Sequence, residues 1–413
     1  MDLPTELIDY IFILLSCKST LSSCSLVCSS WTDLAHRHLF SKFVYTRPES
    51  ETADATPLLR FFQDAPSVAK HVKILDLKSG FGSGTVARCS CYPEVFSGLM
   101  MALPNVEHVI LGSIDPPWPG SNIGDEEDDG DGEDGIDERS KPFVRSWKHL
   151  KSLEIDQNWI DGENPYNTVL QVLQPIESLH TLRVSGGFFS CVNLSNVALR
   201  KYCSTLAAPS HLGIQEFVWN IDILPAIVLL EPLRRAPPCT LRHFDMSYSA
   251  NPNMIWVVQD FLNEVGAGLE TLAITLRGTH NRHLDLSRCK SLQTVTFYHD
   301  TAAHASKDLP LCVNATFNSL STTPHIPFKL FIKFRVFQFH LPKESLRHTR
   351  ILPELNWTNL ARNIRSHPCR ENKVTIIFED PYRFRALDGI ERIVLEKFDL
   401  DAKDWLEVLH QVG

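Results

Sequence analysis

The sequence lacks any apolar run of the roughly 18 residues that a membrane-spanning helix needs. A shorter apolar stretch at residues 7–15 is long enough for a signal-peptide core, but Asp2, Glu6 and Asp9 stand where a signal carries positive charge. The remaining composition, 43% hydrophobic and 22% charged over 413 residues, is that of a globular chain. We therefore expect no membrane partner, and predict an intracellular protein of the cytoplasm or nucleus.

Patterned cysteines are absent too. The eleven cysteines are scattered singly apart from Cys89 and Cys91, with no Cys-x-x-Cys and no Cys/His group at zinc-finger spacing. An odd number of scattered thiols fits a reducing compartment better than a disulfide framework. We expect no metal site and no disulfide framework.

The recognised catalytic motifs are missing as well. The chain has no phosphate-binding Gly-x-x-x-x-Gly-Lys, no Gly-x-Ser-x-Gly and no His-Glu-x-x-His. The glycine-rich stretch Gly80–Gly84 lacks a following lysine and reads as a turn. The 17 histidines allow many imagined acid–base pairs, and no pattern selects one. We predict a non-catalytic protein without a cofactor, with an unrecognised enzyme as a minor alternative.

An overall basic charge is also lacking. The net charge is −9, and ten of the acidic residues fall between Asp125 and Glu138. Without them 39 acidic residues face 40 basic ones, so no nucleic-acid partner is indicated. Like-charge repulsion and glycine content predict a disordered acidic insert at about 116–141. A calcium loop starting at Glu127 is nearly matched, but its first ligand is wrong and no helix pair flanks it.

Residues 3–40 have the clearest local pattern. Leu7, Ile11 and Leu14 fall on one side of a helix, with Ile8 and Phe12 beside them. About 40 residues bury too little surface to be stable alone. The segment is therefore either the first helical hairpin of a larger core or a piece with one face meant for a partner.

This stretch resembles an F-box, most closely those of the large fungal families. The resemblance rests on Leu3-Pro4-x-Glu6-Leu7, on Ile11-Phe12, on Leu21, and on the block from Cys24 to Trp31. It covers about the first 45 residues, and implies a three-helix F-box at 1–45 that binds the Skp adaptor of a cullin–RING ubiquitin ligase. The positions that match the interface or its supporting core are Leu3, Pro4, Leu7, Ile8, Ile11, Leu21, Leu26, Val27 and Trp31.

Beyond a linker and short helix at 46–66, a Leu-x-x-Leu-x-Leu pattern recurs through 67–413. Eight copies run from Val72-x-x-Leu75-x-Leu77 to Leu292-x-x-Val295-x-Phe297, with degenerate ones after them. The steps between copies are irregular and mostly longer than the roughly 20–29 residues of leucine-rich repeats. Generic strands of any α/β sheet could produce such triplets. We predict a mixed α/β fold in which the F-box is followed by an irregular αβ solenoid similar to divergent leucine-rich repeats.

Residues between the apolar positions of each copy should point outward and could form a binding face, or a solvated face that binds nothing. The candidate substrate residues are Asp76, His108, Glu154, Asp156, Arg183, Glu216, Asn220, His243, Asp245, Thr296 and Tyr298. At the C-terminus, Asp401–Val412 reads as a closing amphipathic helix.

These features predict the substrate-recognition adaptor of a Skp–cullin–F-box ubiquitin ligase, with an unknown protein as substrate. The alternative is a leucine-rich-repeat interaction scaffold that takes no part in ubiquitination.

Overall fold

A computed structural model describes the chain in segments that fall into two compact units. One unit comprises Met1–Ser190 with Ala207–Leu212, and the other comprises Cys191–Leu206 with Gly213–Gly413. The described residues are 3–15, 17–46, 55–78, 93–112, 150–156, 172–186, 212–221, 230, 240–246, 255–275, 284–300, 316, 319, 329–335, 362, 374–380 and 406–412.

The first unit begins with three helices. They are α1 (Thr5–Leu14), α2 (Lys18–Ser25) and α3 (Ser29–Leu39). The extended Pro4 precedes α1, and its carbonyl accepts the amides of Leu7 and Ile8. Glu6 in the first turn faces the positive end of the helix dipole. Local signals thus account for the start of α1.

The three helices enclose a small core of their own. Its buried members are Ile8, Phe12, Leu21, Leu34 and Ala35, and the half-buried Trp31 packs against them. The ring of Phe12 meets that of Trp31 edge-on, with centroids 5.6 Å apart. An aromatic pair in this geometry adds about 0.5–1.5 kcal/mol beyond its buried area.

Parallel strands follow directly on α3. These are β1 (Lys42–Thr46), β2 (Ile74–Lys78), β3 (His108–Leu111), β4 (Ser152–Asp156) and β5 (Ser178–Gly186), each paired with the next. Strand β1 was not foreseen, because its five residues carry no copy of the repeated pattern. The three helices therefore lead into the edge of the sheet within two residues, Phe40 and Ser41.

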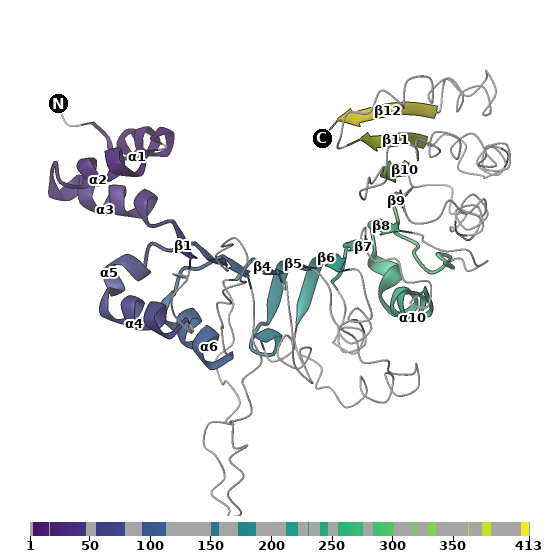
Figure 1. Cartoon of the computed structure of the whole chain (residues 1–413), viewed down its shortest axis with the longest axis horizontal. Coiled ribbons are helices and arrows are strands. Elements are labelled where there is room, and N and C mark those ends of the chain that lie inside the picture. The colour runs from purple at the N-terminus through teal and green to yellow at the C-terminus, as the bar shows by residue number, and fades with distance from the viewer. Residues whose placement is uncertain are drawn as a thin grey trace, which may run out of the picture. The chain divides into compact units, whose positions relative to one another are not determined.

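The strands alternate as a half-buried sheet requires. One cross-strand row is Leu75, Val109, Leu153 and Leu182, all fully buried. Helices α4 (Thr56–Asp64), α5 (Pro66–Ala69) and α6 (Pro93–Ala102) lie together on one side of β1 (Figure 1). Phe43 of β1 packs on Phe62 of α4, with centroids 5.0 Å apart. The core of this part thus lies between the strands and these helices.

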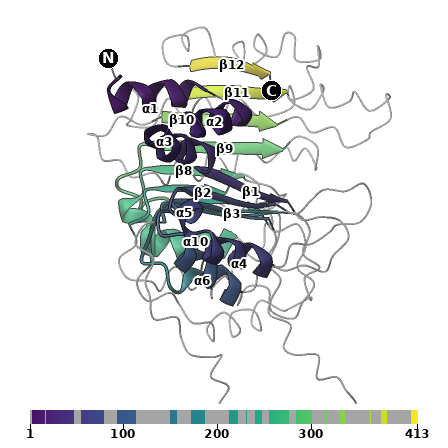
Figure 2. The same cartoon turned by 90° about the vertical axis from the view of Figure 1, so that its left-hand side faces the viewer.

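The second unit repeats this arrangement. Its strands, each parallel to the next, are β6 (Gly213–Ile221), β7 (His243–Met246), β8 (Thr271–Thr275), β9 (Thr294–Asp300), β10 (Lys329–Arg335), β11 (Val374–Asp380) and β12 (Leu406–Val412). Figure 2 shows β9 to β12 side by side. Helix α10 (Ile255–Val265) and the 3₁₀ turn η3 (Gly266–Gly268) precede β8. The ring of Phe261 on α10 packs on that of Phe244 on β7, with ring centroids 5.1 Å apart.

A hydrogen-bonded unit recurs at the start of the strands in both units. The carbonyl of Ser41 accepts the amides of both Lys73 and Ile74, and the carbonyl of Lys73 accepts those of Glu107 and His108. Glu107, Lys151, Arg242 and Glu270 do the same for the strand after each of them. These six hydrogen-bonded units fix the entries of strands β2, β3, β4, β5, β8 and β9 to the strand before each of them.

The mixed α/β character predicted from the sequence is confirmed, and all eight complete copies of the repeated pattern contribute residues to strands β2 to β9. The helix predicted over Asp401–Val412 is wrong, since β12 pairs with β11 in parallel from Leu406 to Val412. Pairing with an open strand edge outweighed a weak helical pattern. The acidic insert lies outside the described residues. Among the described helices, none is long and apolar enough to cross a membrane.

Candidate functional site: the exposed apolar surface of the N-terminal helices

Large apolar side chains project into solvent from the first three helices. On and just before α1 they are Leu3, Leu7, Tyr10, Ile11, Ile13 and Leu14, between 45% and 65% exposed. In the turn between α2 and α3, Leu26 is 85% and Val27 is 64% exposed. Several large apolar side chains left exposed on a small folded piece indicate an interaction site. We call these eight residues the apolar surface.

The nine residues expected from the F-box resemblance divide between this surface and the core. Leu3, Pro4, Leu7, Ile11, Leu26 and Val27 are exposed, Ile8 and Leu21 are buried, and Trp31 is half-buried on Phe12. Sequence spacing could not separate the two roles, because α1 is apolar around most of its circumference.

Three members of the apolar surface were missed as site residues. Tyr10, Ile13 and Leu14 are 60% to 65% exposed, yet they stand outside the motif positions. The signal that could have found them is the excess of apolar residues on α1: more are present than one core-facing stripe can bury.

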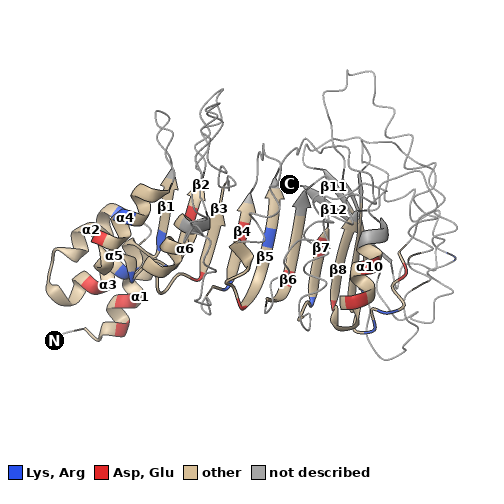
Figure 3. Ribbon diagram, turned by 90° about the horizontal axis from the view of Figure 1, so that it is seen from below, with Lys and Arg blue, Asp and Glu red and all other residues tan. Residues whose placement is uncertain are grey.

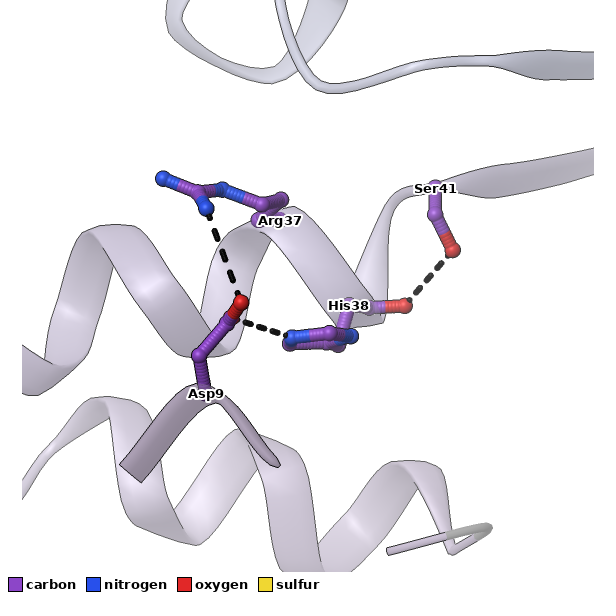
Figure 4. Close-up of polar contacts among 4 residues, drawn as sticks. All are labelled: Asp9, Arg37, His38 and Ser41. Atoms are coloured by element: carbon purple, nitrogen blue, oxygen red, sulfur yellow. Dashed lines mark hydrogen bonds and ion pairs between the residues drawn. The ribbon is translucent and has the colours of Figure 1, made fainter. Parts of the chain in front are cut away.

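A polar cluster holds α1 against the end of α3. His38 Nε2 lies 2.7 Å from Asp9 Oδ1, and Arg37 lies 3.9 Å from the other carboxylate oxygen (Figure 4). The Ser41 hydroxyl donates to the His38 carbonyl at 3.0 Å. These contacts fix the orientation of α1, and hence of the apolar side chains it carries.

A second cluster ties α3 to the turn before β2. Lys70 Nζ donates to Asp33 at 2.9 Å, and His71 Nε2 lies 3.4 Å from the same carboxylate oxygen. The hydrogen bond from Lys70 lowers the pKa of Asp33, while burial lowers the pKa of His71. His36 stacks edge-on to His71 with centroids 6.5 Å apart. The helices are thereby fixed on the first strands.

Two exposed thiols lie at the helix starts. The Ser19 hydroxyl, 2.9 Å from Cys17 Sγ, is the main cause that lowers the pKa of Cys17 to about 6, with backbone amides adding to it. The hydroxyl of Ser30 likewise lowers the pKa of Cys28. Within the described residues, no three His, Cys, Asp or Glu side chains are grouped so that they could hold a metal ion.

The predicted substrate-facing residues whose side chains the structure describes lie on the side of the strands opposite the core of their own unit. In the first unit, Asp76, Ile110, Glu154 and Arg183 form one cross-strand row. His108 lies one row away beside Ser152, and Asp156 pairs in register with Ser185. Arg183 lies 3.8 Å from Glu154, and Lys42 lies 3.7 Å from Asp76. Figure 3 shows segments of both charges on these strands.

The side chains of this row differ in how much of them is exposed to solvent. Asp76 is only 1% exposed, whereas the side chain of Arg183 is 45% exposed. Asp76 therefore contributes little surface to a partner, and the accessible charges of the row are Glu154 and Arg183.

The second unit has its own outward row. Glu216 pairs in register with His243, and Val218 pairs with Asp245. Thr296 and Tyr298 of β9 are buried on this side, at 8% and 9% exposure. Asn220 lies near the end of β6. The four residues predicted on charge or amide grounds, Glu216, Asn220, His243 and Asp245, thus lie on β6 and β7.

Comparison with known protein families gives a match for the first helices. Residues 1–47 match the F-box-like family model. No curated protein matches the chain. F-box domains in general bind the Skp adaptor protein, and typically act as non-catalytic adaptors in ubiquitin ligases. The matched segment contains α1 to α3 and the whole apolar surface.

Proposed function

We propose that this protein is a substrate-recognition adaptor of a Skp–cullin–F-box ubiquitin ligase. The observation that carries the proposal is the apolar surface, which lies on the one segment that matches an F-box-like domain. Eight large apolar side chains in contact with water are costly unless a partner covers them, at about 25 cal/mol per Å². The adaptor's role is binding, and bond chemistry would come from other subunits of the ligase.

The strands beyond the F-box-like segment would hold the substrate. The recurring strand-entry hydrogen bonds, with every strand parallel to the next inside each unit, support a solenoid similar to divergent leucine-rich repeats. The resemblance of the first residues to fungal F-boxes is what suggests a fungal family. Within each unit the substrate would meet the outward side of the strands. Glu154 and Arg183 are only partly covered there in the first unit, and so are Glu216, His243 and Asp245 in the second. Such a protein would work in the cytoplasm or nucleus.

Calorimetry of the full chain with purified Skp adaptor tests the adaptor-binding part of the proposal. We expect tight binding by the native chain, and loss of binding in a Leu7→Asp/Leu26→Asp double variant. Both side chains are exposed, so the variant should fold, as circular dichroism would check. Met101→Asp is the matched control, because Met101 is 60% exposed on α6, outside the matched segment. A folded native chain that fails to bind would refute the proposal.

Ubiquitin transfer separates the adaptor from a scaffold that binds Skp alone. The chain would be added to a reconstituted cullin–RING ligase with candidate substrates captured on the native protein. Ubiquitination that needs both the native apolar surface and an intact outward face supports the adaptor. Skp binding without incorporation into the cullin complex would favour the scaffold.

A further inference from the structure

Strand β12 forms an open edge of the sheet in the second unit. Among the described residues it pairs on one side only, with β11, in parallel and in register from Leu406 to Val412. Figure 2 shows β12 as the outermost of β9 to β12. The helix predicted over Asp401–Val412 would have closed this edge, whereas the strand presents backbone N–H and C=O groups that no other described strand meets.

Strand β12 carries none of the features by which natural edge strands oppose pairing. Such strands are commonly short, are interrupted by a bulge, or contain lysine or proline. The seven residues of β12 include no proline, lysine or arginine, and their register with β11 has no interruption. An edge of this kind is suited to accept a further strand.

Strand β1, the edge of the sheet in the first unit, is protected by comparison. It has five residues and begins directly after α3, with only Phe40 and Ser41 between them. The side chain of Lys42 on this strand is 51% exposed. A contact between β12 of one copy and β1 of the next would also repeat without closure and give a fibre. The contact that closes on itself joins β12 to β12 of a second copy.

The sequence of β12 is complementary to itself in such a contact. Two β12 strands related by a two-fold axis run antiparallel, and full overlap of their seven residues places Leu409 opposite Leu409 of the second copy. Like charges placed opposite each other destabilise antiparallel strands. This register has none, because the only acidic residue of the strand meets an uncharged amide. The other opposite residues are Glu407 and Gln411, Val408 and His410, and Leu406 and Val412.

From these observations we propose that two copies of this protein associate through β12, so that the sheet of one second unit continues antiparallel into that of the other. The occupant of the open edge is a second copy because the whole strand matches itself in charge and in apolar pairing at its centre. The contact is isologous and closes as a dimer. It uses residues 406–412, none of which belongs to the apolar surface, so it does not rest on the proposed function.

Sedimentation velocity of the full chain over a range of concentrations tests the dimer. We expect a monomer–dimer equilibrium in the native chain. Leu409→Lys or Leu409→Asp would place two like charges opposite each other, so each variant alone should have a dimer Kd about 10- to 30-fold higher. An equimolar mixture of the two should associate again, because opposite charges then meet, and this rescue shows that both variants are folded. Met101→Lys, which adds a charge at an exposed site on α6, should leave the Kd unchanged.

Disulfide formation tests the register of the contact. Leu409→Cys should give a covalent dimer on mild oxidation, because the two residues 409 lie opposite each other, within the roughly 4.4–6.8 Å between Cα atoms that a disulfide spans. Glu407→Cys on the same strand should give no more covalent dimer than the native chain, since its copy lies four residues away, at about 13 Å. The native chain is the reference for the eleven cysteines already present.

Three results would overturn the proposal. The native chain could sediment as a monomer at every concentration, or it could form fibres, which would indicate contact between β12 and β1. Alternatively, its dimer could be unaffected by both Leu409 variants and so lie elsewhere on the chain. None of these results touches the proposed function, because adaptor binding by the native chain is measured separately. We expect monomeric Leu409→Lys to bind the Skp adaptor with the native affinity.

Discussion

At the scale of single residues, neighbouring side chains of similar chemistry have opposite environments. Leu7 is half exposed while Ile8, the next residue, is in the core. The thiols differ in the same way: burial raises the pKa of Cys289 to about 12, whereas hydrogen bonds lower the pKa of Cys17 to about 6. Residue type alone does not fix either property.

Thiol reactivity follows from these environments. We expect iodoacetamide to modify Cys17 with a pH midpoint near 6 and Cys289 not at all in the folded protein, because the thiolate is the reactive form. Peptide mass spectrometry after labelling between pH 5 and 9 would measure both. In Ser19→Ala the Cys17 midpoint should rise, since the main stabilising hydrogen bond is gone. A Cys17 midpoint near 9 in the native chain would contradict the prediction.

Close packing at η3 gives a second residue-scale prediction. A Cβ on Gly266 would lie 2.7 Å from Cys289 Sγ, so Gly266→Ala should lower the stability by about 1–3 kcal/mol. In a Cys289→Ala background the same substitution should cost much less, because the clashing sulfur is absent. Thermal unfolding of the four proteins of this cycle measures the coupling. Equal costs in both backgrounds would show that the contact does not matter.

At the scale of elements, the corner of α3 and α5 makes stability depend on pH. The folded-state pKa of His71 is lowered by burial, so between it and the ordinary value of 6.5 the unfolded chain binds more protons. The contribution of this histidine is complete above pH 6.5 and is lost as the pH falls below it. The lowered pKa of Asp33 acts in a separate window, below its ordinary value of 3.8.

Denaturant unfolding of the native chain and of His71→Gln, between pH 5 and 8, checks this sign. We expect the free energy of unfolding of the native chain to fall with acidification more steeply than that of the variant. A Lys70→Met variant, unfolded in the same way at pH values around and below 3.8, serves as the control for the acidic window, where it should raise the Asp33 pKa toward 3.8. If His71→Gln and the native chain show the same change of unfolding free energy between pH 5 and 7, the protonation of His71 is not coupled to folding.

At the scale of the whole molecule, adaptor binding and substrate capture should be separable by mutation. Glu154→Ala/Arg183→Ala removes an exposed ion pair, and such pairs contribute at most about 1 kcal/mol, so the fold should be intact. We expect unchanged affinity for the Skp adaptor and reduced capture of substrate. Calorimetry and a pull-down with the captured substrate measure the two. Loss of adaptor binding in this variant would mean that the outward face and the apolar surface act together.

Much of the architecture could be predicted because it follows from the short-range spacing of apolar residues along the chain. The strands of both units coincide with a repeated apolar triplet, and α1 begins where Pro4 and Glu6 indicate. Strand β12 escaped prediction, since its seven residues have no local preference strong enough to outweigh pairing with β11. Strand β1 escaped because its five residues carry no copy of the repeated triplet.

The sequence by itself determined where the first helices and strands β2 to β9 form, because hydrophobic period and proline act on neighbours along the chain. It also determined the resemblance of the first residues to an F-box. Only the tertiary structure decided which apolar residues of α1 are core and which face solvent. That choice depends on where α3 packs, and α3 is positioned by Phe12, by the Asp9–His38 contact and by the Asp33 cluster. Those contacts join residues far apart in sequence, and no local pattern contains them.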